Sequence, residues 1–219
     1  MKNLFLAFFC CFITVLCFAQ QGHPPFWNEV QKFKTQDSVL ASTAHPILLI
    51  GSSSFTMWKD VQDYFPAYPI KNRGFGGSML TNLIFYFNDL VPPVKPKQII
   101  IYCGENDLAN DSLPADSALN RFQRLFHLIR MYDKKVPIAY ISMKPSPSRE
   151  KYLQKFEAAN KAIRKYIRKK RNTQYINIFD AMLLPDGKPN KELFLNDQLH
   201  MNSKGYQIWQ HIIEPYLKK

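Results

Sequence analysis

The fold of this 219-residue chain is decided by the stretch Pro46-Ile47-Leu48-Leu49-Ile50-Gly51-Ser52-Ser53-Ser54-Phe55-Thr56-Met57-Trp58. Its apolar run has the length and β-branched content of a buried parallel strand. The glycine permits a sharp turn, and three serines follow where the next helix would start. Ligands of open α/β sheets bind outside the carboxyl ends of the strands, so a serine hydroxyl here would face a site. Capping of the helix N-terminus is the alternative role for these serines.

Strand and helix patterns alternate five times along the rest of the chain, without internal repeats. The predicted strands are 46–50, 70–73, 98–103, 136–143 and 175–179, and the predicted helices are 55–65, 79–90, 112–129, 146–166 and 203–217. Alternation of this kind predicts an α/β protein, a three-layer α/β/α sandwich in which helices cover both faces of a parallel sheet.

The N-terminus has the pattern of an export signal. A short basic start is followed by an apolar run that ends in small residues, which predicts a signal peptide over residues 1–19 with cleavage after Ala19. An uncleaved membrane anchor is the alternative, although the run is short for a span. We expect a leader over residues 20–44, with one helix from Pro25 to about Gln36, and a single domain over residues 45–219. The protein would then act in the periplasm or outside the cell.

Cysteine usage excludes a disulfide framework within the mature chain. Cys10, Cys11 and Cys17 lie in the predicted signal peptide, which leaves only Cys103. No Cys/His spacing typical of a metal site is present, so no metal is expected.

The chain is strongly basic, with a formal net charge of +12. Many of the cations lie within residues 161–171, which we interpret as the solvated end of a helix, where cations also suit the helix dipole. A weak attraction to anionic glycans or lipid headgroups is the alternative. No nucleic-acid-binding motif is present, so nucleic acid is not an expected partner.

Chemically useful residues occur in four loops that the predicted topology brings to one edge of the sheet. The loops are Ser52–Ser54, the glycine-rich Asn72–Ser78, Gly104–Asp107 and Asp197–Asn202. They supply a hydroxyl, backbone amides, a carboxamide and an Asp/His pair, which acyl transfer needs as nucleophile, base, orienting group and oxyanion donors. Each loop alone also fits a structural role, as a glycine turn, an Asx-turn or a helix cap.

These four blocks resemble the SGNH hydrolases, also called the GDSL esterase/lipase family, from Ile47 onward. The matching residues are Gly51-Ser52-Ser53 for Gly-Asp-Ser, Gly77 for the second block's glycine, Gly104-Glu105-Asn106-Asp107 for Gly-x-Asn-Asp, and Asp197 to His200 for Asp-x-x-His. The segment Ser142–Arg149 also looks like one common in a bacterial subgroup. The resemblance implies a flavodoxin-like five-stranded sandwich and a hydrolase of esters or thioesters that needs no cofactor.

The resemblance also implies a catalytic triad. Ser53 would be the nucleophile, with Ser52 and Ser54 as competing choices. His200 would be the general base, and Asp197 would orient it and balance its charge.

An oxyanion hole is implied as well, formed by the Ser53 and Gly77 N–H groups and the Asn106 side-chain amide. The sequence departs from the family at Ser52, where most members have Asp. Because that Asp is not a triad member, we expect the chemistry to survive, with the rigidity of the loop and the pose of Ser53 as the properties affected.

We therefore expect a secreted serine hydrolase of short-acyl or acetyl esters of carbohydrate, or of lipid esters, acting on a small-molecule or glycan substrate. Phe55, Trp58, Phe75 and Phe194 would shape a pocket or fill the core, and the core is favoured for Trp58. Two alternatives from other classes are a non-catalytic glycan-binding module on the same fold and a flavodoxin-like FMN-binding protein.

Overall fold

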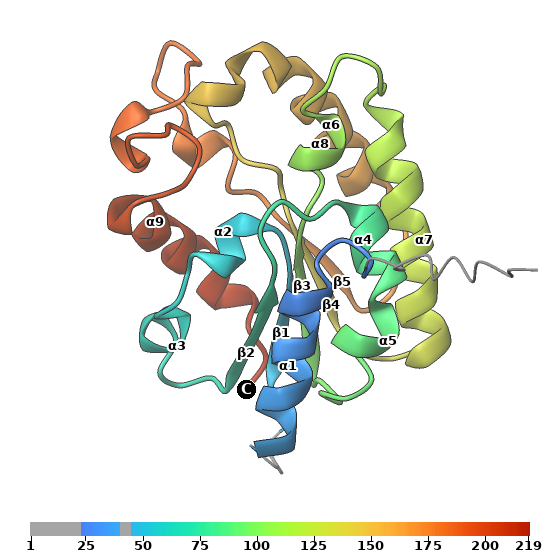
Figure 1. Ribbon diagram of the computed structural model, residues 1–219. Coiled ribbons are helices and arrows are strands. Elements are labelled where there is room, and N and C mark those ends of the chain that lie inside the picture. The colour runs from blue at the N-terminus through green and yellow to red at the C-terminus, as the bar shows by residue number, and fades with distance from the viewer. Residues whose placement is uncertain (1–22, 40–44) are drawn as a thin grey trace, which may run out of the picture.

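A computed structural model describes residues 23–39 and 45–219 (Figure 1). The predicted signal peptide and its cleavage position lie outside these residues. Within the two described ranges, no helix has the length and apolar character needed to cross a membrane.

Five parallel strands form one sheet in the order β2-β1-β3-β4-β5, which confirms the predicted sheet. The strands are β1 (Ile47–Gly51), β2 (Ile70–Gly74), β3 (Gln98–Tyr102), β4 (Ile138–Ile141) and β5 (Thr173–Ile176). The chain leaves β1 for β2 on one side and later returns to β3 on the other side of β1. The carboxyl ends of β1 and β3 therefore flank the switch point at which such sheets bind ligands.

Helices cover both faces of the sheet, as predicted for a three-layer sandwich (Figure 1). The α-helices are α1 (Trp27–Val39), α2 (Ser53–Thr56), α3 (Val61–Tyr64), α4 (Leu80–Phe85), α5 (Phe87–Leu90), α6 (Glu105–Leu108), α7 (Asp116–Tyr132), α8 (Leu153–Ile167) and α9 (Ser203–Ile213). The 3₁₀ helices are η1 (Pro147–Tyr152), η2 (Asp180–Met182), η3 (Lys191–Leu193) and η4 (Glu214–Tyr216). Side chains of α1, α4, α5, α7 and α8 pack on one face, and those of α2, α3 and α9 on the other.

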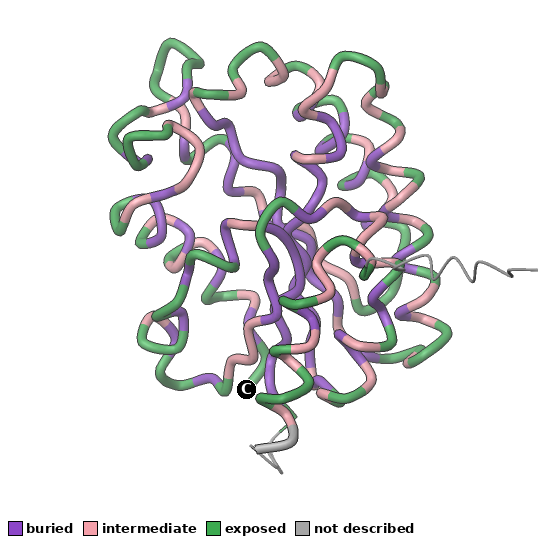
Figure 2. Tube along the Cα trace, viewed as in Figure 1, coloured by how far each residue is buried: buried purple, intermediate pink, exposed green. Residues whose placement is uncertain are grey.

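The core is built from alternate strand residues. On β1, Leu48 and Ile50 pack under one helix layer, whereas Ile47 and Leu49 pack under the other. This alternation follows from the two-residue period of a strand, and the strands in the centre of the molecule are buried throughout (Figure 2). Because both faces of the sheet are covered, the central strands β1, β3 and β4 are almost continuously apolar. The edge strands β2 and β5 also carry polar residues.

Two predicted helices are each broken in two by tertiary contacts. The helix expected over 55–65 stops after α2 because Asn72 Nδ2 donates to the carbonyl oxygen of Phe55 (2.7 Å) and Trp58 turns into the core. The helix expected over 79–90 breaks at Tyr86, whose hydroxyl donates to the Pro25 carbonyl oxygen (2.7 Å).

The leader helix α1 docks on the domain. Val30 is fully buried, and Trp27 and Phe33 are partly buried against the same core cluster. An ion pair between Arg73 of β2 and Asp37 of α1 adds a polar attachment. Desolvation lowers the pKa of the buried Arg73 guanidinium to about 10, against the opposing field of Asp89, so it remains charged at neutral pH.

Candidate active site

The turn from β1 to α2 presents the three serines at the switch point. Gly51 ends β1 so close to β3 that a Cβ built on it would lie 2.0 Å from the Tyr102 carbonyl oxygen, which excludes any side chain there. The Ser52 N–H donates to the same oxygen (3.0 Å). Helix α2 then begins at Ser53, and the Ser52 side chain makes no capping hydrogen bond to it. The capping alternative for Ser52 is therefore wrong.

The three serines differ in how far they are exposed to solvent. Ser52 and Ser54 are 5% and 1% exposed, whereas Ser53 is only partly buried. A substrate can reach a nucleophile only where its oxygen is accessible, so this difference favours Ser53 over its two neighbours.

The glycine-rich loop after β2 folds over the end of β1. The Phe75 N–H (3.0 Å) and the Ser78 hydroxyl (3.1 Å) both donate to the Gly51 carbonyl oxygen. Gly77 has φ +78, a conformation that favours glycine. A Cβ built on Gly76 would lie 4.0 Å from Ser53 Cβ, so this loop passes directly beside the candidate nucleophile.

The beginning of the predicted loop, in contrast, belongs to β2. Asn72 and Arg73 lie within the strand. The Arg73 guanidinium is fully buried and donates to the carbonyl oxygens of Asp89 (2.6 Å) and Leu90 (3.0 Å), so its role is structural.

Asn106 lies on α6, directly after β3, and its amide contacts the β1 turn. Asn106 Nδ2 donates to Ser52 Oγ (2.7 Å) and to the Ser78 carbonyl oxygen (3.0 Å). Asn106 Oδ1 accepts from Arg149 Nη2 (2.6 Å). The structure thus places the predicted carboxamide beside both the first and the second block.

Asp107, the next residue, is not in an Asx-turn. Its fully buried carboxylate accepts from the Leu80 N–H at the start of α4 (3.0 Å) and from Arg121 Nη1 (2.7 Å). Desolvation raises the pKa of this carboxyl, although the Arg121 hydrogen bond and charge oppose that change.

Asp197 and His200 form the predicted pair, in the loop before α9. Asp197 Oδ2 lies 2.5 Å from His200 Nδ1, and Asp197 Oδ1 accepts the backbone N–H groups of Leu199 and His200 (both 2.9 Å). Desolvation acts to raise the pKa of this carboxyl. The hydrogen bonds from the His200 backbone and ring and from the Leu199 backbone outweigh it and lower the pKa to about 2.

The loop that carries this pair is fastened at both ends. Asn202 caps α9 by accepting the Gly205 N–H (3.2 Å), and its amide donates to the carbonyl oxygens of Glu192 (2.8 Å) and Phe194 (3.1 Å). The Tyr206 hydroxyl on α9 donates to the Ser54 carbonyl oxygen on α2 (2.8 Å), which ties the helix after the Asp/His loop to the helix that carries Ser53.

The remaining contact of the predicted triad is not formed in this structure. Among the described residues, no hydrogen bond joins Ser53 Oγ to the His200 ring. Catalytic hydrogen bonds are often long outside the Michaelis complex, so this geometry is compatible with a triad that tightens on substrate binding.

A buried ionic cluster lies behind Asn106, formed by Glu105, Lys144 and Arg149. The side chain of Lys144 is 1% exposed, and its ammonium donates to Glu105 Oε2 (3.0 Å) and to the Tyr102 hydroxyl (3.3 Å). Arg149 Nη1 lies 3.9 Å from the same Glu105 oxygen. Desolvation lowers the pKa of Lys144, and the adjacent Glu105 carboxylate opposes this.

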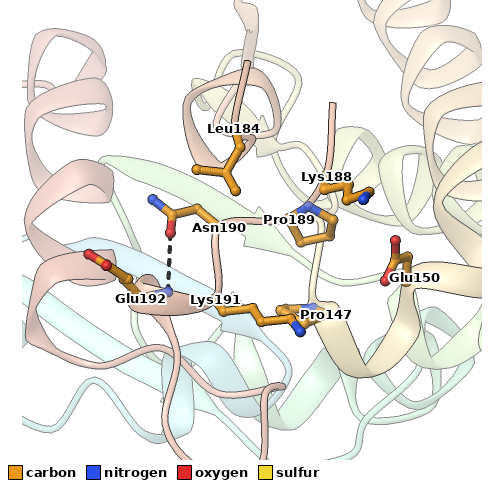
Figure 3. Close-up of a pocket in the computed structure, with 8 residues that line it drawn as sticks. All are labelled: Pro147, Glu150, Leu184, Lys188, Pro189, Asn190, Lys191 and Glu192. Atoms are coloured by element: carbon orange, nitrogen blue, oxygen red, sulfur yellow. Dashed lines mark hydrogen bonds between the residues drawn. The ribbon is translucent and has the colours of Figure 1, made fainter. Parts of the chain in front are cut away.

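An open hollow of about 500 Å³ lies between η1 and the segment that precedes the Asp/His loop (Figure 3). Its lining mixes apolar and charged side chains, contributed by Pro147, Glu150, Leu184, Lys188, Pro189, Asn190, Lys191 and Glu192. None of the predicted catalytic residues lines it. Its wall is nevertheless joined to the Asp/His loop, because the Ser148 N–H donates to the Gln198 carbonyl oxygen (3.0 Å).

Metal ligation has no support in the described part of the chain. Within residues 23–39 and 45–219, no group of three or more His, Cys, Asp or Glu side chains is arranged to hold a metal ion. The remaining polar constellation, a hydroxyl, an Asp/His pair and a carboxamide at one sheet edge, is suited to acyl transfer.

Comparison with known families decides the assignment. The model of the GDSL-like lipase/acylhydrolase family matches residues 37–208, more than half of the chain. The chain belongs to the GDSL-like lipase/acylhydrolase family. This confirms the resemblance seen in the four blocks and makes the protein an ester hydrolase by family. No curated protein sequence matches the chain.

Solved structures of GDSL proteins share the fold. A GDSL-like lipase from Bacteroides thetaiotaomicron superimposes with a TM-score of 0.72 at 19% identity, over 85% of this chain and 96% of its own. A protein from Streptococcus pneumonia, named in connection with platelet activating factor, gives 0.76 at 24%, over 87% and 92%. A family 3 carbohydrate esterase from Clostridium thermocellum gives 0.58 at 12%, over 78% and 95%.

Sequence reasoning missed the ionic cluster behind Asn106. Glu105 occupies the variable position of the third block, and Lys144 and Arg149 lie in the segment Ser142–Arg149, to which the sequence alone assigns no role. The available signal was a lysine placed directly after a buried strand, where a charge requires a partner.

Proposed function

We propose that this GDSL hydrolase cleaves carboxylic esters through a Ser53–His200–Asp197 triad. The observation that carries the proposal is the short contact between Asp197 and His200, on a loop tied to the helix that begins at Ser53. Because His200 Nδ1 faces the carboxylate, Nε2 is the ring nitrogen left to act on a serine hydroxyl.

In the proposed reaction Ser53 Oγ attacks the ester carbonyl carbon while His200 Nε2 takes the hydroxyl proton. The carbonyl oxygen becomes an oxyanion, which accepts hydrogen bonds from the N–H groups of Ser53 and Gly77 and from Asn106 Nδ2. For this, Nδ2 redirects to the oxyanion the hydrogen that it donates to Ser52 Oγ in this structure. The intermediate collapses when His200 returns the proton to the leaving alcohol. Water then attacks the acyl-Ser53 ester, again with His200 as base, and releases the carboxylic acid.

For the substrate, we propose short-acyl or acetyl esters of carbohydrate, with lipid esters as the alternative. The aromatic residues that could have widened an acyl pocket are all in the core, since Phe55, Trp58, Phe75 and Phe194 are buried. Carbohydrate esterase activity is named for one structural neighbour. The hollow beside η1, with its mixed polar and apolar lining, is the proposed place for a sugar-like alcohol part.

For location, we propose an exported enzyme from which residues 1–19 are removed. A basic surface at residues 161–171, exposed apart from Ala162, Ile163, Tyr166 and Ile167, would give weak attraction to anionic glycans or headgroups. N-terminal sequencing of protein secreted by the native host tests the cleavage, with Gln20 as the expected first residue. A chain that still begins at Met1 would contradict it.

The test of the hydrolase proposal compares Ser53→Ala with its neighbour Ser54→Ala on acetyl, butyryl and octanoyl nitrophenyl esters. We expect Ser53→Ala to lose at least about 10³-fold in kcat, and Ser54→Ala to stay close to the wild type. The wild type should prefer the acetyl ester. Full activity of Ser53→Ala would overturn the triad, and a preference for octanoyl would overturn the short-acyl assignment.

A further inference from the structure

The orientation of the Asn106 amide is fixed by three partners. An arginine only donates hydrogen bonds and a backbone carbonyl only accepts them, so the contact of Arg149 with Oδ1 and that of Ser78 with Nδ2 allow one amide orientation. In that orientation Nδ2 faces the Ser52 turn, where the proposed oxyanion forms. Without Arg149, nothing among the described residues would donate to Oδ1.

Arg149 is itself held in place. It lies in η1 with φ −118 and ψ 21, which is not helical, and its side chain is only 17% exposed. Glu105 lies at 3.9 Å from Nη1, and Glu105 is anchored in turn by Lys144. The Ser148 N–H joins the same 3₁₀ helix to Gln198 in the Asp/His loop. One short segment therefore contacts both the oxyanion donor and the loop of the general base.

From this geometry we propose that Arg149 is a positioning residue for ester hydrolysis, which orients and polarises the Asn106 amide as an oxyanion donor. The inference rests on the proposed function. A charged donor on Oδ1 draws electron density away from Nδ2, so the Nδ2 hydrogens become stronger donors as the oxyanion develops. This effect acts mainly in the transition state, so its loss lowers kcat and leaves KM nearly unchanged.

The experiment measures kcat and KM on nitrophenyl acetate, a neutral substrate, for Arg149→Met, Arg149→Lys, Asn106→Ala and Arg149→Met/Asn106→Ala. We expect a loss of roughly 10- to 100-fold in kcat for Arg149→Met, less than the 10²–10³-fold typical of deleting an oxyanion donor. Arg149→Lys should recover part of the loss. The double variant should be no slower than Asn106→Ala, because Arg149 acts through Asn106. Lys151→Met, an exposed cation on the same 3₁₀ helix, is the matched control and should behave as the wild type.

A second measurement separates positioning from folding. Guanidinium chloride at low millimolar concentration should restore part of the kcat of Arg149→Ala and leave Lys151→Met and Asn106→Ala unchanged. Additive losses in the double variant, an effect on KM alone, or an Arg149→Met enzyme with wild-type kcat would each overturn the inference. An inactive Ser53→Ala combined with a fully active Arg149→Met removes only this inference, whereas a fully active Ser53→Ala removes the proposed function itself.

Discussion

Asp197 holds His200 through both of its carboxylate oxygens: Oδ2 lies 2.5 Å from the ring Nδ1, and Oδ1 accepts the His200 backbone N–H at 2.9 Å. The carboxylate thus fixes the ring and the backbone that carries it. A three-residue separation allows this because the intervening Gln198 adopts φ +54 and turns the chain sharply. The Asp-x-x-His spacing is therefore a compact way to build an oriented general base.

Asp197→Asn should lower kcat by about 10²–10⁴-fold. An amide would present either a donor or an acceptor to His200 Nδ1 without charge, so the tautomer with a free Nε2 base is no longer favoured. The control is Asp186→Asn, another exposed carboxylate that accepts a nearby backbone N–H (3.0 Å). Equal rates for Asp197→Asn and the wild type on nitrophenyl acetate would remove Asp197 from the mechanism.

Asp197 should also leave a signature in acid unfolding. Its folded pKa of about 2 lies below the ordinary value of 3.8. Its contribution to stability is therefore complete above pH 3.8 and is lost as the pH falls towards 2. The difference in unfolding free energy between wild type and Asp197→Asn, measured by urea titration, should be constant from pH 8 to about 5 and shrink below pH 4. A difference that grew on acidification would contradict this sign.

Ser52→Ala should retain activity within about fivefold of the wild type, because Arg149 and Ser78 still hold the Asn106 amide. The Ser52 hydroxyl accepts one Nδ2 hydrogen (2.7 Å), so we interpret it as a neutral substitute, within this turn, for the family's Asp. Hydrolysis of nitrophenyl acetate gives the rates. A loss as large as that of Ser53→Ala would instead make Ser52 the nucleophile.

Lys144→Met should cost about 3–5 kcal/mol of unfolding free energy, because it leaves the buried Glu105 carboxylate without its closest cation. Adding Glu105→Gln should recover part of this loss, because the glutamine side chain carries no charge. Its carbonyl oxygen can still accept the backbone N–H of residue 144, as Glu105 Oε1 does in the wild type (3.2 Å). Urea unfolding of both variants measures the effect. Exposed Lys151→Met should leave the unfolding free energy close to that of the wild type. Equal loss of unfolding free energy in Lys144→Met and Lys151→Met would show that the buried ion pair stabilises the protein no more than the exposed one does.

The central strands could be predicted from sequence because β1, β3 and β4 are short, largely apolar runs, and burial on both faces of the sheet favours such runs. The breaks in the two helices expected over 55–65 and 79–90 could not be predicted from sequence. Trp58 leaves the expected helix to pack against Tyr206 and Trp209, which lie near the other end of the chain. Local periodicity carries no information about contacts at that separation.

The candidate site could also be predicted only in part from the sequence. Its four loops could be found because strand ends converge at a known edge of the fold. The hydrogen bond that orients the Asn106 side chain could not be predicted, because its donor is Arg149, 43 residues away in the chain. The sequence pattern predicts that the segment around Arg149 starts a regular helix from Ser146. It is instead a 3₁₀ helix, and the Ser146 side chain makes no capping bond.

The identity of the nucleophile tests the central claim most directly. The wild-type enzyme is treated with a fluorophosphonate, digested, and the labelled residue is located by mass spectrometry, with heat-unfolded protein as the control for non-specific reaction. The account predicts one label, on Ser53, and none in Ser53→Ala. A label on Ser52 or Ser54, or no label on an enzyme that hydrolyses nitrophenyl acetate, would contradict it.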